Sequence, residues 1–333
     1  MSVLSRALGP GRRGRRTGGE YLRDYLDAVA GPDLVLVDGD PTWSHEPCVF
    51  VYRVDGATAH FLYITHGVSR TTSSQPVAGT QIELTLRLPV TDPTTPPAWP
   101  IARLKALARY ARGSEHPIEP GHYMDLYGPV TAGADLTAFI FVNDPVLKLV
   151  ELPTGVVRFV YAVGVRSDEL DAALSWDPLR FAGVLGEAVP LGLSNPTRAS
   201  VLDSAPFNDR IAASIAEEGS SVAAVSAAYF AVDMGDGGTR IDMDPNAATH
   251  LLRALRHRLS HATAFAILGA KAWARFLPAD AAVPSSIESS TDSVTISLNH
   301  DLLNEFKAVF DAEPGVYRFT SVPLVITVID PNR

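Results

Sequence analysis

Residues 81–89, QIELTLRLP, alternate strictly between apolar and polar side chains. This period of two is that of a β-strand with one apolar and one polar face, and it forces the chain to build a sheet. The apolar face holds Ile82, Leu84, Leu86 and Leu88, and the polar face holds Gln81, Glu83, Thr85 and Arg87. A proline-rich connection follows, and Pro100 then opens an amphipathic helix at a position where its missing N–H costs nothing.

Runs of β-branched and aromatic residues predict further strands, and apolar stripes at helical spacing predict helices between them. We expect strands at 48–54, 60–69, 138–142, 155–165 and 293–299, a hairpin at 227–244 and a last strand at 317–330. We expect helices at 20–31, 100–111, 167–176, 178–189, 208–219, 249–262 and 301–313. Both halves of the chain mix helices with runs of strands. The predicted class is α+β, with a mixed β-sheet packed with helices in each of two domains.

The length of 333 residues favours two domains, and the helix that stops at Gly219 before a new hairpin marks their boundary. We predict a disordered basic leader at 1–19, an N-terminal domain at 20–219 and a C-terminal domain at 220–333. The leader holds five arginines and no acid, so the remainder has 23 basic and 37 acidic residues and a formal charge of −14. An acidic body disfavours nucleic acid as a partner, because phosphate binding needs a basic surface.

The sequence does not match the patterns of an export signal or a membrane-spanning helix. The arginine pairs 12–13 and 15–16 are not followed by the apolar segment of an export signal. No apolar stretch approaches the ~20 residues that span a bilayer, and the lone Cys48 cannot form an intramolecular disulfide. We expect a cytoplasmic protein without a membrane partner.

The enzyme motifs that we compared with the sequence do not match it either. Ser69 in GVSRT lacks the second glycine of a nucleophile elbow. His257 and His261 have a metal-binding spacing, but a solvated basic helix explains them better. Asp233 and Asp236 lack the ligand spacing of a calcium loop, and a hairpin turn explains them. We predict no catalytic residue, no metal and no cofactor.

Several ordered stretches carry a family resemblance. They are HFLYITHGVSR, IELTLRLP, PAWPIARLKALARYA, GHYMDLYGPV, AFIFVNDP and GVVRFVYAVGVRSDELDAALSW. Together they resemble the suppressor of fused family, closely to residue 180 and more weakly to about 330. The resemblance implies two α+β domains and a non-catalytic binding protein. In animal members a short segment of a zinc-finger transcription factor lies as an added strand in the cleft between the domains.

The resemblance also implies a set of partner-binding residues. A tyrosine of the family's Ala-Arg-Tyr motif contacts the peptide, and Tyr110 stands there. Gly121 replaces the aspartate of a Gly-Asp-His motif, and Asn143 replaces the glutamate of a Glu-Asp-Pro motif. The implied site is Tyr110, Gly121, His122, Tyr123, Asn143 and Asp144. The loss of two acids implies a ligand different from the animal one.

Two hypotheses of function remain open. The first is a non-catalytic module that captures a polypeptide in the interdomain cleft. Bacterial members resemble immunity proteins that neutralise polymorphic toxins, and the acidic body suits a basic toxin. The alternative is a hydrolase or small-ligand-binding protein that uses the same cleft.

Overall fold

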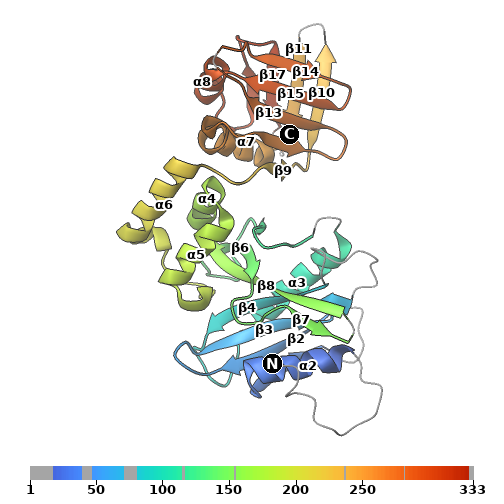
Figure 1. The fold of residues 1–333 in the computed structure, drawn as a ribbon, viewed down its shortest axis with the longest axis vertical. Coiled ribbons are helices and arrows are strands. Elements are labelled where there is room, and N and C mark those ends of the chain that lie inside the picture. Colours follow the sequence, from blue (N-terminus) through green and yellow to red (C-terminus); the bar gives the residue numbers. More distant parts are fainter. Residues whose placement is uncertain are drawn as a thin grey trace. The chain divides into compact units, whose positions relative to one another are not determined.

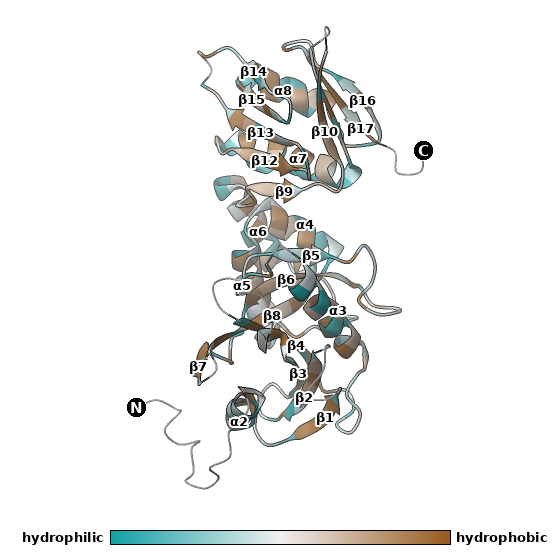
Figure 2. Ribbon diagram, turned by 90° about the vertical axis from the view of Figure 1, so that its right-hand side faces the viewer, coloured by the Kyte–Doolittle hydropathy of each residue, from teal (hydrophilic) through white to brown (hydrophobic). Residues whose placement is uncertain are grey.

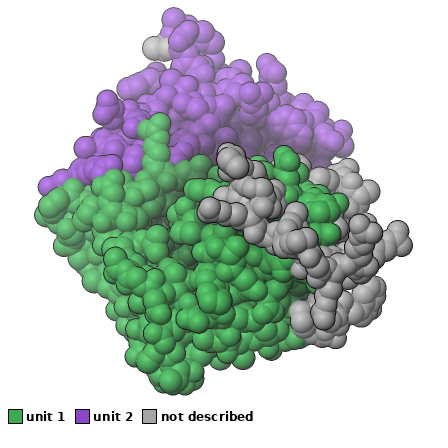
Figure 3. Space-filling model, turned by 60° about the horizontal axis from the view of Figure 1, so that its bottom comes forward, with its two compact units in different colours: residues 1–170, 178–207 green, residues 171–177, 208–333 purple. Residues whose placement is uncertain are grey.

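The computed structural model describes residues 18–39, 47–70, 81–114, 117–153, 155–235, 238–280 and 282–329. The chain divides into two compact units, which differ in colour in Figure 3. Unit 1 comprises residues 1–170 and 178–207, and unit 2 comprises 171–177 and 208–333. Most of the predicted leader, residues 1–17, lies outside the described residues. The domain boundary at 219/220 stays a prediction.

Unit 1 is built on one mixed, eight-stranded sheet (Figure 1). The strands run in the order β1-β2-β3-β4-β8-β6-β5, and β7 pairs with β8. Their bounds are Leu34–Asp38 (β1), Cys48–Val54 (β2), His60–His66 (β3), Gln81–Pro89 (β4), Tyr123–Asp125 (β5), Leu136–Asn143 (β6), Val150–Leu152 (β7) and Gly155–Arg166 (β8). Strands β4 and β8 are parallel, and the other pairs are antiparallel.

Helices cover both faces of this sheet. Those with residues in unit 1 are Gly18–Ala30 (α2), Trp99–Gly113 (α3), Ser167–Ser175 (α4), Pro178–Ala188 (α5) and the start of Ala205–Glu218 (α6). Short 3-10 turns lie at Val68–Arg70 (η1), Pro190–Gly192 (η3) and Val201–Asp203 (η4). The apolar stripe of α3 packs into the core on one face, whereas α2 packs into a separate core on the other. Helices α3 and α5 lie on opposite sides of β6 and β8 (Figure 2).

Most of the polar face of β4 is buried as completely as its apolar face, and Gln81 at the start of the strand is half-buried. Glu83, Thr85 and Arg87 are all fully buried. The Glu83 carboxylate accepts hydrogen bonds from the backbone N–H groups of Gly67, Val68 and Ser69 and from the hydroxyls of Thr65 and Ser69. A charge can be buried here because each of its lone pairs has a donor.

Unit 2 contains two sheets around one core. The four-stranded sheet has the order β10-β11-β17-β16, and the five-stranded sheet has the order β14-β15-β13-β12-β9. Strand bounds are Ala224–Ser226 (β9), Phe230–Gly235 (β10), Gly238–Met243 (β11), Phe265–Leu268 (β12), Trp273–Pro278 (β13), Ser286–Ser289 (β14), Ser293–Leu298 (β15), Gly315–Arg318 (β16) and Leu324–Val328 (β17). Helices Pro245–His257 (α7) and His300–Val309 (α8) contribute side chains to the same core.

The α+β class predicted from the sequence is confirmed, and several elements differ from expectation. Strands β1, β5, β7, β9, β12, β13 and β14 lie outside the predicted strands, and the helix predicted at 301–313 ends at Val309. The helix predicted at 249–262 ends at His257, because Arg258 leaves helical backbone geometry and a short 3-10 turn (η5) covers Leu259–His261. The strand predicted at 317–330 is two antiparallel strands, β16 and β17, with a turn between them. Within the described ranges, no helix is long and apolar enough to cross a membrane.

Candidate functional site

Three of the predicted site residues lie together where the chain enters β5, the last strand of the unit 1 sheet. The N–H of Gly121 donates to the carbonyl of Phe141 at 2.8 Å, and the N–H of Phe141 donates to the carbonyl of His122 at 2.9 Å. Tyr123 then pairs with Ile140 of β6. Gly121 has a φ of +93°, which other residues adopt only with strain. The glycine therefore lets this segment turn directly onto the sheet.

Successive residues at this edge point to opposite faces of the sheet. Met124 and Phe141 belong to the core beneath α3, so His122, opposite Phe141, lies on the α3 side. Gly121 and Tyr123 alternate with His122 and Met124 along the strand, so they lie on the opposite face, which is the α5 side. A Cβ placed on Gly121 would stand 3.5 Å from Cγ of Leu179 in α5, which supports this assignment.

Tyr110 lies on the α3 side as well. It occupies the last turn of α3, away from the buried stripe of that helix, and its side chain is 41% exposed. The helix ends just beyond it, where the N–H of Ser114 donates to the Tyr110 carbonyl at 2.8 Å. His122 is exposed, with Nδ1 3.0 Å from the carbonyl oxygen of Pro117. An aromatic ring and an imidazole are thus both exposed on the α3 side of the sheet.

Asn143 and Asp144 end strand β6 and have opposite environments. Asn143 is exposed, whereas Asp144 is buried. The Asp144 carboxylate accepts two hydrogen bonds from Arg87, at 2.7 and 2.8 Å, and one from the Thr85 hydroxyl at 2.6 Å. The backbone N–H groups of Val146 and Leu147 also donate to it. These contacts hold the turn after β6, so Asp144 positions Asn143 and does not itself face solvent.

The ionisation of Asp144 follows from these contacts. Burial would raise the pKa of its carboxyl, but the Arg87 guanidinium and the hydrogen bonds outweigh burial and lower the pKa below its usual value. The carboxylate is therefore charged at neutral pH and is neutralised by Arg87 within the core.

A hollow of about 400 Å³ opens between α5 and the sheet, and we call it the α5 pocket. It is lined by Val142, Asn143, Pro145, Tyr161, Val163, Leu179, Ala182, Gly183, Gly186, Leu191 and Gly192. Tyr161 is the one ionisable residue of this lining, and its hydroxyl donates to the carbonyl of Gly192 at 2.6 Å. Burial raises the pKa of Tyr161, so the pocket is uncharged at neutral pH. Asn143 and Leu179 connect the pocket to the β5 edge.

The wall of the pocket at Leu191 and Gly192 is tied to the sheet. Leu191 has a φ of +57°, an uncommon conformation for a residue with a side chain. Just beyond it, the N–H of Ser194 donates to the Arg87 carbonyl, and the Ser194 hydroxyl accepts from the N–H of Gly164, both at 2.9 Å. The wall is therefore fixed before any ligand arrives.

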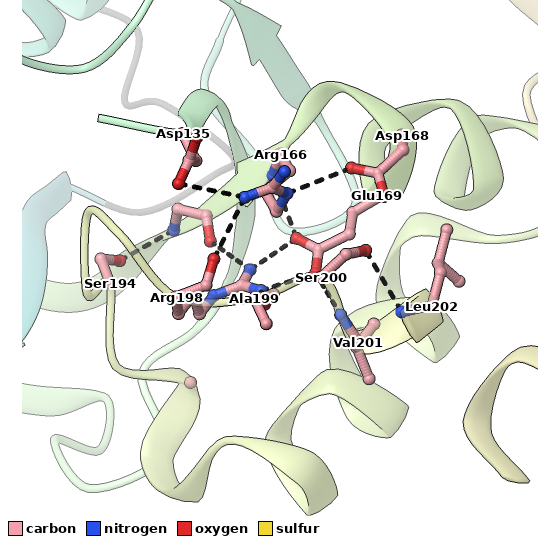
Figure 4. Close-up of polar contacts among 12 residues, drawn as sticks. Asp135, Arg166, Asp168, Glu169, Ser194, Arg198, Ala199, Ser200, Val201 and Leu202 are labelled. Atoms are coloured by element: carbon pink, nitrogen blue, oxygen red, sulfur yellow. Dashed lines mark hydrogen bonds and ion pairs between the residues drawn. The ribbon is translucent and has the colours of Figure 1, made fainter. Parts of the chain in front are cut away.

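A buried ion pair anchors the segment that follows (Figure 4). Both guanidinium ends of Arg198 bond the two oxygens of Glu169 at 2.5 Å, and Glu169 is fully buried. The N–H groups of Val201 and Arg166 donate to the same carboxylate. On the outer side, Arg166 lies between Asp135 at 3.2 Å and Asp168 at 3.5 Å. Two-point contacts of this kind hold a loop in one position.

The residues considered for catalysis or metal binding lie among contacts that stabilise the fold. Ser69 is buried and donates to Glu83 at 2.5 Å. His250 is buried beside Arg253, contrary to the expected solvated helix, and His261 contacts the carbonyl of Ala216. Among the described residues, no group of three His, Cys, Asp or Glu could hold a metal ion. Asp233 is exposed in β10, whereas Asp236 lies outside the described residues.

Comparison with known proteins identifies the larger part of unit 1. Residues 46–199 match the family model of suppressor of fused protein (SUFU). Over these residues, a little under half of the chain, the sequence is similar to the suppressor of fused family. The suppressor of fused homologues of Homo sapiens and Mus musculus are each 30% identical over 145 residues. That match covers 39% of this chain and only 30% of either homologue.

Solved structures extend the likeness in fold beyond this suppressor of fused domain. Drosophila Suppressor of Fused superposes with a TM-score of 0.68 at 18% identity, covering 94% of this chain and 97% of its own. A chain from the Sufu–Fu complex superposes with a TM-score of 0.51 at 22% identity, covering 60% of this chain and 96% of its own. At these identities the shared property is the fold.

The sequence reasoning missed the α5 pocket, although its signal was present. Leu179, Ala182, Gly183 and Gly186 follow the spacing i, i+3, i+4, i+7 and form one stripe of α5. An apolar stripe on a helix normally packs inward. Two glycines within it indicate instead a surface that leaves room beside the helix.

Proposed function

We propose that this protein is a non-catalytic module that binds a polypeptide at the β5 edge of unit 1. The observation that carries the proposal is the placement of the predicted contact residues. Tyr110 and His122 are exposed on the α3 side of the sheet, and Gly121 and Tyr123 lie on the α5 side of β5. A peptide added beside β5 would direct its own side chains alternately to these two sides.

The known complex of a structural relative supports a protein partner. A chain of this fold has been solved in the Sufu–Fu complex. Strand addition draws its strength from backbone hydrogen bonds and its selectivity from side chains on the two faces. Acids of the family motifs are replaced by Gly121 and Asn143 in this chain, so its partner is selected by other contacts. The expectation that the polypeptide lies in a cleft between the two domains stays a prediction.

The polar groups near the edge favour binding over catalysis. A hydrolase needs a nucleophile and a base within hydrogen-bond reach of each other and of the substrate. At this edge the carboxylate of Asp144 is committed to Arg87, and the hydroxyl of Tyr161 is committed to Gly192. Turnover of a substrate by the purified protein would contradict the proposal and favour the hydrolase alternative.

A displayed library of random linear peptides, selected on the immobilised full chain, tests the proposed function. Selected peptides should lose affinity for the Tyr110→Ala variant by ~1–3 kcal/mol, as expected of an exposed aromatic contact. The matched control is Tyr229→Ala, which removes a similarly exposed tyrosine of unit 2. Circular dichroism checks that both variants fold. A library that yields no binder, or binders that ignore Tyr110→Ala and His122→Ala together, would refute the proposal.

For the natural partner we propose a basic toxin domain that this protein neutralises as an immunity protein in a bacterial cytoplasm. The charge of −14 outside the first 19 residues supports this class, because opposite charges accelerate association. Co-expression with the product of the adjacent gene should protect the cell, and the association rate should fall steeply with added salt. An adjacent product that is harmless alone, or that binds with a salt-independent rate, would count against an immunity role.

A further inference from the structure

We infer that the α5 pocket receives an apolar, uncharged side chain of the polypeptide bound at the β5 edge. This inference rests on the proposed function and adds to it the chemical class of the side chain that the site selects. The polypeptide is thus anchored by a large aliphatic or aromatic residue, while its backbone lies along β5.

The position of the pocket relative to the strand supports this assignment. Tyr123 lies opposite Ile140, which shares a sheet face with Val142, and Val142 lines the pocket. A strand added beside β5 therefore directs every second side chain to the face on which the pocket opens. Gly121 lies at the rim, where any side chain would point at Leu179.

The lining determines which side chain fits. Its ionisable group, the Tyr161 hydroxyl, is already bonded to Gly192, so a charged side chain would find no opposite charge there. Burying an unpaired charge is strongly unfavourable, whereas burying an apolar side chain is favourable. The exposed amide of Asn143 can bond the peptide backbone where the anchor enters. The volume of about 400 Å³ lies at the small end of the ~300–1,000 Å³ typical of ligand pockets.

The glycines of α5 are an independent sign of an external ligand. Gly183 and Gly186 lie inside the helix, where glycine is less stable than alanine. A Cβ built on either residue would meet no atom within 4 Å, so packing within the protein does not require glycine at these positions. Glycine at these positions leaves room for a bound side chain to approach the helix backbone. Leu179, at the same stripe, is 45% exposed and would be covered by an anchor residue.

A pocket-filling variant tests the inference with the selected peptides as probes. Gly186→Leu places a side chain in the pocket at a position with open space. Gly235→Leu makes the same change in open space at the end of β10 and is the matched control. We expect the peptides to share an apolar residue at one position. Gly186→Leu should weaken their binding at least tenfold, and Gly235→Leu should change it less than twofold.

A double-mutant cycle locates the contact. Replacing the shared apolar residue of the peptide by alanine should weaken binding at least tenfold, and Gly186→Leu should then have little further effect. Methyl resonances of Val142, Val163 and Leu179 should shift with the parent peptide and not with its alanine form. This second measurement uses the unaltered protein and does not depend on the folding of any variant.

The outcomes separate the two proposals. Peptides that respond to Tyr110→Ala but bind Gly186→Leu at full strength would overturn the pocket inference and leave the proposed function standing. A charged residue at the shared position would also overturn the inference. A library without any binder would refute the proposed function, and the inference with it.

Discussion

Replacing Asp144 by asparagine should reveal how strongly the end of β6 depends on its buried ion pair. The substitution leaves Arg87 charged, fully buried and without its carboxylate. Breaking a buried pair by removing one partner costs ~3–5 kcal/mol. Asparagine can still accept from the N–H groups of Val146 and Leu147, so we expect the lower value, about 3 kcal/mol. For a unit of this size, that corresponds to a melting temperature lowered by about 6–12 °C.

Differential scanning calorimetry and urea unfolding measure this loss. A double variant, Arg87→Met with Asp144→Asn, removes the unpaired charge and should recover at least half of the lost stability. Asp171→Asn is the control, because the exposed ion pair of Asp171 with Arg253 should contribute only ~0–1 kcal/mol. Because the folded pKa of Asp144 is lowered, its contribution is present above the unfolded value of ~3.9 and is lost as pH falls through the folded value.

Two results would refute this reasoning. If Asp144→Asn were as stable as the wild type, Arg87 would not depend on the carboxylate. If the double variant were less stable than the single one, the guanidinium would stabilise the fold without its partner, and its position 5.0 Å from the Tyr161 ring would be the first alternative to test.

Three further predictions concern stability. Burial, and then Arg253, lower the pKa of the His250 imidazole to about 4. The neutral imidazole therefore stabilises the fold fully above pH ~6.5, and this contribution is lost as pH falls to about 4. His250→Phe should flatten the pH dependence of the melting temperature, and an unchanged profile would exclude His250 as its source. Glu83→Gln should lower the free energy of unfolding in urea by ~3 kcal/mol, because a neutral amide cannot accept hydrogen bonds from all the donors that now bond the Glu83 carboxylate. Ser69→Ala should lower it by ~1 kcal/mol, and equal losses would contradict this ranking. Removing residues 1–17 should leave the melting temperature unchanged, because their sequence has no apolar periodicity, and a drop of several degrees would show that they pack on the body.

Strand β4 shows both the reach and the limit of sequence reasoning. Its bounds and its period follow from alternation alone, because side chains in a strand point to opposite faces. Alternation cannot reveal that the polar face is buried too. That outcome depends on the remote partners Thr65 and Asp144, which lie 18 and 57 residues from the β4 residues they bond, Glu83 and Arg87. Local pattern therefore predicts the strand, and long-range pairing decides its environment.

For the candidate site too, the sequence predicts some features, and others depend on contacts between distant residues. The motifs around Tyr110, His122 and Asn143 could be located from the sequence, and the structure brings His122 and Asn143 to one sheet edge. Asp144 was expected among the contact residues, yet its side chain is used internally; its role toward a partner stays a prediction. The α5 pocket depends on how a helix crosses two strands, and no single stretch of sequence contains that geometry.

The split of α4 between the two units has a consequence for biosynthesis on the ribosome. Residues 171–177 belong to unit 2, where the Leu174 carbonyl accepts from Ser220, and Trp176 bonds Glu218 and Ser221. These partners, and Arg253 opposite Asp171, are translated later. At ~5–20 residues per second, the ~80 residues up to Arg253 take roughly 4–16 s. During that interval Leu174 and Trp176, which are buried in the finished fold, lack these partners, so the nascent chain offers a short apolar segment that a chaperone can hold until unit 2 is complete.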